Sequence, residues 1–218
     1  CPGPLAAAPP VYAWEPLRPW RPGQPRLRRG FWRGACVVLF SFFLFSLVGY
    51  AAVSDVVVHA FRQALAGIGV NNLVAVEVGG WPVWAQLLVL FVLRDFIHWN
   101  VHRLLHRVDV LWQFHKVHHS VVQMGFAAHL RFHWMETVVY RTLEYLPLAL
   151  VGFGIDDFMI VHMTALVIGH LNHANIHVPL GPFRYFLNNP RMHIWHPMRH
   201  FPASQPAGVN FGLRLSVW

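Results

Sequence analysis

The segment from Ala35 to Val53 constrains the fold of this chain more than any other, because every residue in it is apolar or small. At about 1.5 Å per residue, a helix of this length crosses the roughly 30 Å hydrocarbon core of a bilayer. The chain of 218 residues is 56% hydrophobic and 12% charged, which leaves too little polar surface to cover a water-soluble globule. We therefore expect an all-α integral membrane protein.

Three further apolar segments follow, and each is expected to be helical. Residues 81–93 continue without a helix breaker to His106, so one helix is expected to leave the bilayer and extend into water. Residues 137–155 form the next segment, and residues 158–171 follow two aspartates at 156–157 that suit an N-cap. Because each is short for a full span, the sequence predicts two to four spanning or re-entrant helices.

Residues 1–30 are rich in proline and have no hydrophobic periodicity, which predicts a lead-in without a packed element before one domain at 31–218. The net charge of +8 comes almost entirely from arginine. Arginine clusters before the first apolar segment at Arg18, Arg21, Arg26, Arg28, Arg29 and Arg33. This position favours a cytoplasmic membrane flank over a nucleic-acid surface. With the N-terminus inside, the successive crossings place the histidine-rich segments on the cytoplasmic side.

Histidine has the most informative spacing in this sequence, and fifteen of the 16 histidines lie after residue 97. They cluster as His98, His102 and His106; His115, His118 and His119; His173 and His177; and His193 and His196. Side chains three or four positions apart project from one face of a helix, so each cluster can deliver its imidazoles to one point. Because one metal rarely takes more than about four to six donors, this many convergent imidazoles indicate two transition-metal ions. Iron, zinc, copper and nickel all accept imidazole ligands.

The remaining histidines are interpreted differently, as ordinary buried or interfacial polar groups. They include His59, His129, His162 and His170. For the clusters metal binding is favoured, since several imidazoles buried near a bilayer are costly without a partner, and a metal supplies one.

The residues around the clusters resemble a known family. The stretch DFIHWNVHRLLHRVDVLWQFHKVHHS, residues 95–120, resembles the boxes DxxxxWxHRxxH and WxFHxxHHS of the fatty acid hydroxylase and sterol desaturase superfamily. Later motifs of that family are similar to RFHWMET at 131–137, HANIHVPLGP at 173–182, NPRMHIWH at 189–196 and NFGLRLSVW at 210–218. The resemblance covers residues 90–218.

The resemblance implies a non-haem centre of two iron ions held by histidines, with zinc as a substitute metal. The implied ligands are His102, His106, His115, His118, His119, His173, His177, His193 and His196. His98 is expected beside the ligands or in a structural role. Asp95 and Glu136 are each expected either to accept the second N–H of a ligating histidine or to form a salt bridge. The salt-bridge partners would be Arg94 or Arg103 for Asp95, and Arg131 for Glu136.

Position 197 departs from the family pattern. The third box normally reads HxxHH, but its last position here is Pro197, which offers no ligand atom and cannot continue a helix. Three interpretations stay open: His200 replaces the missing ligand, fewer histidines and a water hold the second metal, or the chain is catalytically impaired. Since the chain starts at Cys1 and stops at Trp218 inside a motif, we also expect a fragment truncated at both ends.

The implied activity is the dioxygen-dependent hydroxylation or desaturation of a C–H bond in a membrane lipid, such as a fatty acyl chain or a sterol. Electrons would come from an external reductase or haem carrier, because the sequence has no Rossmann glycine fingerprint and no cysteine set for an iron–sulfur cluster. The alternatives from other classes are a haem-binding or a zinc-binding membrane protein. A zinc hydrolase is disfavoured because HExxH is absent.

Overall fold

The computed structural model describes the helices that surround the histidine clusters. The described residues are 3–25, 31–37, 56, 59–61, 63–69, 78–121, 123–125, 128–129, 131–193 and 210–218. Within these ranges the regular elements are helical, and the extended pairings are two isolated bridges. The all-α prediction is therefore confirmed. The predicted span at 35–53 lies almost wholly outside the described residues, since α2 (Phe31–Val37) reaches only its beginning.

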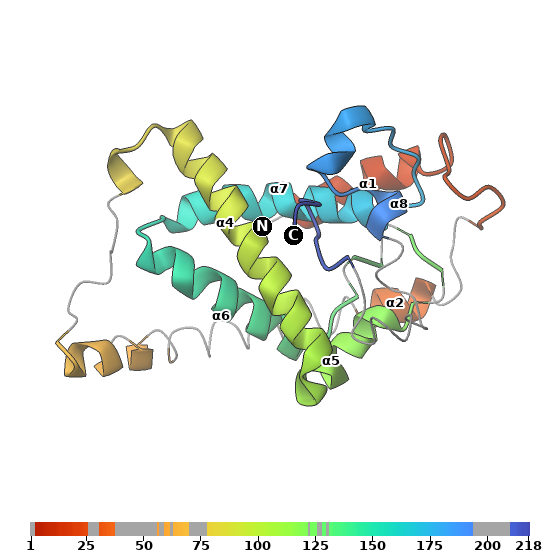
Figure 1. Cartoon of the computed structure of the whole chain (residues 1–218). Helices are drawn as coiled ribbons and strands as arrows, with labels where there is room; N and C mark the ends of the chain where they lie inside the picture. Colours follow the sequence, from red (N-terminus) through yellow and green to blue (C-terminus); the bar gives the residue numbers. More distant parts are fainter. Residues whose placement is uncertain are drawn as a thin grey trace.

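Helix α4 (Val83–Arg107) carries the first histidine cluster and is continuous from the apolar segment through His106, as the sequence predicts. Pro82 stands at its N-cap, where a missing backbone N–H is not needed for the helix. Val108 ends the helix in an extended conformation, and α5 (Asp109–His119) then packs back against α4 (Figure 1). This turn brings the second histidine cluster beside the first.

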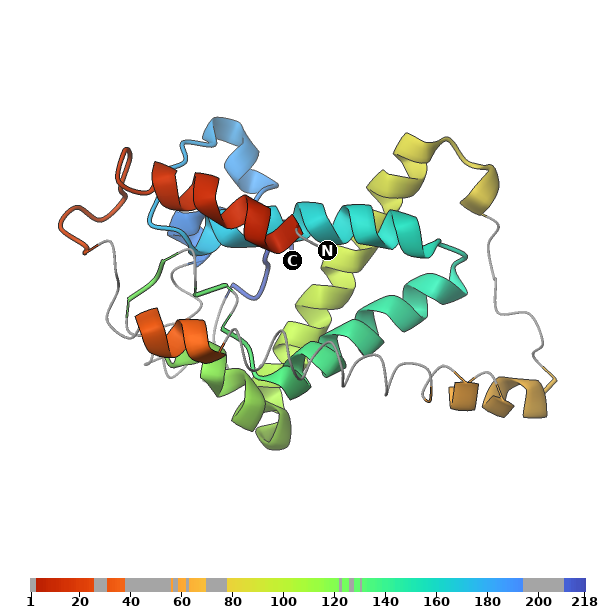
Figure 2. The same ribbon diagram turned by 180° about the vertical axis from the view of Figure 1, so that it is seen from behind.

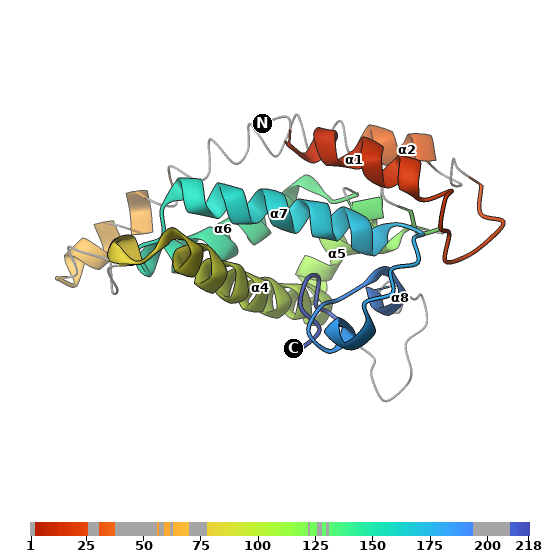
Figure 3. The same ribbon diagram turned by 90° about the horizontal axis from the view of Figure 1, so that it is seen from above.

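Helices α6 (Trp134–Leu150) and α7 (Ile155–His173) lie beside α4 and pack against it (Figures 1 and 3). Apolar side chains from the three helices and from η2 (Val78–Gly80) form the largest core cluster. Its buried members are Val78, Leu90, Leu148, Phe153, Phe158 and Val161. This core holds the three helices together at the end away from the histidines.

The turn between α6 and α7 differs from the sequence prediction in its capping residue. Gly154 is the N-cap of α7, and Asp156 and Asp157 lie in the first turn instead. In that turn their charges still interact favourably with the positive end of the helix. Gly152 has a φ of 89° in the same turn, a left-handed conformation that costs glycine little.

The prediction that residues 1–30 contain no packed element is wrong for the described part of this segment. Helix α1 (Gly3–Trp14) packs along α7, where Val11 is buried with Ala174 and Ile176 (Figure 2). The backbone N–H of Asn175 donates to Glu15 Oε1 over 2.8 Å, and the N–H of Arg21 donates to Asn175 Oδ1 over 2.8 Å. Among the side chains that the structure describes in this segment, Val11 supplies the buried apolar contact, and polar contacts of Glu15 and Arg21 add to it.

After α7 the chain forms η4 (Gly181–Tyr185) and α8 (Pro190–His193). Residues 210–218 then return to α4. In the described part of the chain, no helix is both long enough and apolar enough to cross a bilayer. The apolar segments at 81–93, 137–155 and 158–171 correspond to parts of α4, α6 and α7.

Leu105→Ala should lower the free energy of unfolding by about 2–5 kcal/mol, because this fully buried side chain packs with Val101 and Tyr140 and its removal leaves a cavity. Leu104→Ala is the matched control, since Leu104 lies next to it on α4 and is 42% exposed. Chemical denaturation of the purified variants measures both changes. An equal loss of unfolding free energy in the two variants would contradict the assignment of Leu105 to the buried face of α4.

Candidate metal centre

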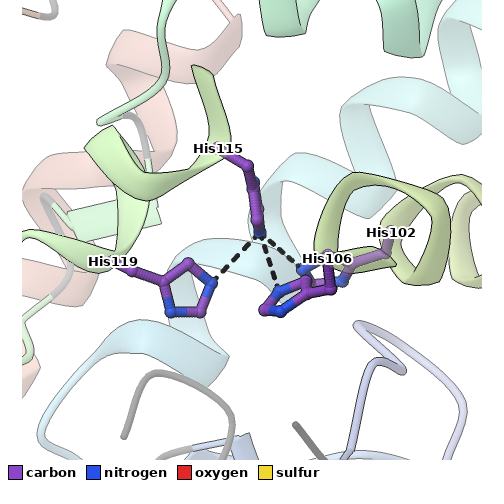
Figure 4. A group of neighbouring side chains, drawn as sticks. All are labelled: His102, His106, His115 and His119. Carbon is purple, nitrogen blue, oxygen red and sulfur yellow. Dashed lines mark hydrogen bonds between the residues drawn. The ribbon is translucent and has the colours of Figure 1, made fainter. Parts of the chain in front are cut away.

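Histidines from four helices gather in two groups where α4, α5, α7 and α8 meet. The first histidine group consists of His102 and His106 of α4 and His115 and His119 of α5 (Figure 4). The second histidine group consists of His118 of α5, His173 at the end of α7 and His193 at the end of α8. Within each group, one ring nitrogen from every histidine lies within 4.8 Å of the others.

The first histidine group has the spacing of ligands around a shared ion. Nε2 of His115 lies 3.1 Å from Nε2 of each of the other three histidines (Figure 4). One imidazole nitrogen has either a hydrogen or a lone pair, so it cannot form three hydrogen bonds at once. Nitrogens about 2.1 Å from one ion lie about 3.0–3.4 Å apart, which matches this spacing. The donor set therefore fits a transition metal.

The second histidine group has the same character and adjoins the first. Nε2 of His173 lies 3.3 Å from Nε2 of His118 and 3.1 Å from Nε2 of His193. The HxxHH pattern of α5 divides between the groups, because His118 and His119 are neighbours in the chain and point about 100° apart around the helix. The rings of His115 and His118 are 5.5 Å apart between centroids. Two adjacent metal positions are therefore geometrically available.

Acceptors behind the histidines orient their rings. Nδ1 of His115 donates to Glu136 Oε1 over 2.7 Å, and both residues are buried. Nδ1 of His102 donates to the carbonyl of Phe211 over 2.9 Å, and Nδ1 of His173 to the carbonyl of Gly169 over 2.8 Å. Because a backbone carbonyl only accepts, the proton of His102 and of His173 sits on Nδ1 and the lone pair of Nε2 faces the group; an ionised Glu136 would orient His115 in the same way.

The electrostatics of the groups favours neutral imidazoles. Burial, followed by the neighbouring histidines, lowers the pKa of His102, His115 and His118 well below the ordinary value. Burial also lowers the pKa of His119 to about 3 and that of His173 to about 4. A histidine must be unprotonated to bind a metal, so the environment supplies the required form at neutral pH. Burial raises the pKa of Glu136 well above its usual range.

A cavity of about 80 Å³ lies between the two groups, large enough for several water-sized molecules. Five of its lining residues are histidines of the groups themselves, and the other lining residues are both polar and apolar. The lining includes His102, His115, His118, His173, His193, Phe132, Tyr140, Ala165, Leu166 and Leu213. A small molecule in this cavity would contact histidines of both groups.

The two carboxylates predicted to support the ligands have different partners, a histidine for Glu136 and an arginine for Asp95. Glu136 contacts His115, as one of the two expectations for it requires. Asp95 contacts no histidine among the described residues. Its salt-bridge partner is neither Arg94 nor Arg103 but Arg214, whose Nη1 lies 2.9 Å from Asp95 Oδ1. The reason is distance along α4, since Asp95 lies two turns, or about 10 Å, before His102. His98 also lies beside the ligands, and its Nδ1 donates to Glu144 Oε1 over 2.5 Å.

Among the described residues, one predicted ligand lies outside the two groups, and two further predicted ligands lie beyond the described part of the chain. His177 is exposed and belongs to neither, because the chain leaves α7 at Ala174 in an extended conformation and the four-residue helical spacing from His173 is lost. His196 and His200 lie outside the described residues, as does Pro197.

His129, interpreted from the sequence as an ordinary buried or interfacial polar group, is buried and lies outside both groups. It lines the central cavity and stacks on His173 with 4.9 Å between ring centroids. Gly169 makes room for it, because a Cβ at that position would lie 2.0 Å from the His129 ring. His129 lies outside the boxes and outside any helix of regular spacing, so no periodic signal marks it.

Lowering the pH from about 7 to about 4 should destabilise the metal-free protein. In the folded state the pKa of His119 is about 3 and that of His173 is about 4, against 6.5 for an ordinary histidine. Below about pH 6.5 the unfolded chain therefore binds more protons than the folded protein, and stability falls as the pH drops toward the folded values. Thermal unfolding across this range measures the effect. An unfolding temperature that does not change with pH would contradict the burial of unprotonated histidines. His177→Ala is the control, because His177 is exposed, and it should keep the wild-type pH dependence.

Comparison with known proteins agrees with this geometry. Residues 87–218, more than half of the chain, match the fatty acid hydroxylase family. The ornithine lipid hydroxylase OlsE of Rhizobium tropici is 32% identical over 138 residues, which are 63% of this chain and 41% of that protein. The very-long-chain aldehyde decarbonylase GL1-10 of Oryza sativa subsp. japonica is 41% identical over 56 residues, 25% of this chain and 18% of that protein.

The chain thus spans less than half the length of either of these relatives. No solved structure matches it significantly. The matched range contains the histidines of both groups together with Glu136 and the C-terminal residues that contact them. This chain therefore belongs to the fatty acid hydroxylase family.

Proposed function

We propose that this chain catalyses the dioxygen-dependent hydroxylation or desaturation of a C–H bond in a membrane lipid, with one iron ion at each histidine group. The observation that carries the proposal is the convergence of neutral imidazole nitrogens at two adjacent buried points. Membership of the fatty acid hydroxylase family, and the likeness to an ornithine lipid hydroxylase, support a lipid as the substrate.

Iron fits the donor set, because imidazole is a ligand that iron accepts readily. Among the described residues, the groups contain no carboxylate ligand, unlike the glutamate and histidine sets of soluble di-iron bundles. When bound, iron would supply the activation of dioxygen and the oxidation of the C–H bond. We propose His196 as a further ligand of the second group, with His200 as the candidate to replace the histidine missing at Pro197.

The protein's own residues would hold the metals, shape the reaction space and exclude water. Glu136 keeps the lone pair of His115 directed at the first group. The cavity between the groups brings Phe132, Tyr140 and Leu166 to the same space as the histidines. We propose that the reacting carbon of the lipid and dioxygen meet in this cavity, shielded from bulk water by the apolar walls.

The lipid substrate implies a membrane location, which the apolar composition and the segment at 35–53 support. We propose a multi-pass membrane protein with its histidine groups on the cytoplasmic side, consistent with the arginine cluster before that segment. Electrons would come from an external reductase or haem carrier.

The purified protein loaded with Fe(II) should bind about two iron ions per chain, one at each histidine group. His115→Ala and His118→Ala should each reduce this to about one, because each removes a ligand from a different group. His59→Ala is the control, since His59 is exposed and lies in neither group. Elemental analysis gives the stoichiometry. Unchanged iron content in both ligand variants would contradict the assignment, and a Soret absorption band would indicate haem instead.

Expression of the protein in a host should produce a lipid with one added oxygen atom or one added double bond. Mass spectrometry of host lipids distinguishes these two products. The His118→Ala variant should form neither, because the second metal position loses a ligand, whereas His59→Ala should form the same product as the wild type. Iron binding without any new lipid would show that the chain is a catalytically impaired member of the family.

A further inference from the structure

Residues 210–218, which we call the C-terminal strap, lie across α4 and the segment between α7 and α8. Asn172 Nδ2 donates to the carbonyl of Leu213, and Asn188 Nδ2 donates to the carbonyl of Gly212. The backbone of Asn188 donates to the carbonyl of Arg214 over 2.8 Å. These bonds attach the strap to parts of the chain far from it in sequence. The dark blue segment in Figure 1 shows this path beside α4 and α8.

Asp95 of α4 anchors the strap with both carboxylate oxygens. Oδ1 accepts from Arg214 Nη1 over 2.9 Å. Oδ2 accepts from the backbone N–H of Leu215 over 3.2 Å and from Trp218 Nε1 over 2.9 Å. The side chains of Asp95 and Arg214 are 1% and 3% exposed, so water does not compete for this pair. Three donors from one short segment make Asp95 the main attachment point of the strap on α4.

The other end of the strap reaches both histidine groups. The carbonyl of Phe211 accepts from Nδ1 of His102 in the first group over 2.9 Å. Asn210 Nδ2 donates to the carbonyl of Met192, the residue directly before His193 of the second group. Two neighbouring residues of the strap therefore hold one histidine of the first group and the backbone beside one histidine of the second.

The conformation that makes these contacts depends on two residues of the strap. Asn210 has a φ of 57°, a left-handed conformation that asparagine adopts more readily than most residues. Its side chain donates to the carbonyl of Met192, next to His193. Gly212 allows the following turn, because a Cβ there would lie 2.4 Å from the carbonyl oxygen of Leu215.

We propose that the C-terminal strap is a positioning element that sets one histidine in each metal group, and that Asp95 controls metal affinity through the strap without contacting either group. Asp95 is thus a positioning residue. This inference rests on the proposed function only in requiring that the two histidine groups bind metals; it does not depend on which substrate is oxidised.

Cobalt(II) titration of the metal-free full chain tests the proposal, because the visible absorption of bound cobalt reports on its ligand geometry. Asp95→Ala should weaken cobalt binding about 10–100-fold, the usual effect of removing a group that orients metal ligands. Gly212→Ala should do the same with Asp95 intact, because the strap must shift. Arg214→Lys, which keeps the positive charge opposite Asp95, should restore most of the affinity lost in Arg214→Leu.

Leu148→Ala is the control for a general loss of stability. Leu148 is 1% exposed and belongs to the core cluster of Leu90 and Phe158, which includes no residue of the strap. Its variant should unfold at a lower temperature while its cobalt affinity stays within about threefold of the wild type. An equal loss of affinity in Leu148→Ala would overturn the proposal, because the effect would then come from destabilisation alone.

Wild-type affinity and an unchanged cobalt spectrum in both Asp95→Ala and Gly212→Ala would also overturn it. If Asp95→Ala does not fold, Trp218→Phe removes one donor to the same carboxylate and should weaken cobalt binding to a smaller degree. Cobalt binding that depends on the strap, in a protein that forms no new lipid, would leave this inference standing and remove only the proposed activity.

Discussion

The burial of many imidazoles at one place is the physical constraint on which the rest of this structure depends. A buried imidazole has two ring nitrogens, and an unpaired polar atom in a dry interior costs about 1–3 kcal/mol. In the first group, one nitrogen of His102 and one of His115 face the group, and the other donates to a carbonyl or a carboxylate. His173 repeats this arrangement in the second group. The helices must therefore supply acceptors as well as histidines.

The inner face of α4 shows how this requirement organises the fold. It presents four polar residues to the interior, and the partner of each lies outside α4. These residues are Arg94, Asp95, His98 and His102. Glu144 of α6 accepts hydrogen bonds from both Arg94 and His98. The C-terminal strap forms hydrogen bonds with Asp95 and His102. Removing one member of such a buried ion pair typically costs about 3–5 kcal/mol. These polar contacts thus hold α6 and the strap against α4, in addition to the apolar core.

Several features of the site could be predicted because they depend on local spacing. The helical course of residues 83–107 and the separate clusters on α4 and α5 follow from periodicity. Glu136 lies beside a ligand, as one expectation for it stated. The partner of Asp95 could not be predicted, because Arg214 is 119 residues away and no local pattern links them. The packing of α1 and the position of His129 could not be predicted for the same reason, because both depend on contacts with the end of α7.

The sequence by itself determined the helical course of residues 83–107 and which histidines share a helical face, because both properties repeat with the period of the helix. It also determined the family, through motifs whose residues lie close together in the chain. Only the tertiary structure decided how the histidines divide into two groups, with His118 separated from its neighbours on α5. It alone decided that His177 stays outside and that the strap reaches both groups. These outcomes depend on how distant helices pack, and side-chain packing between distant segments leaves no period in the sequence.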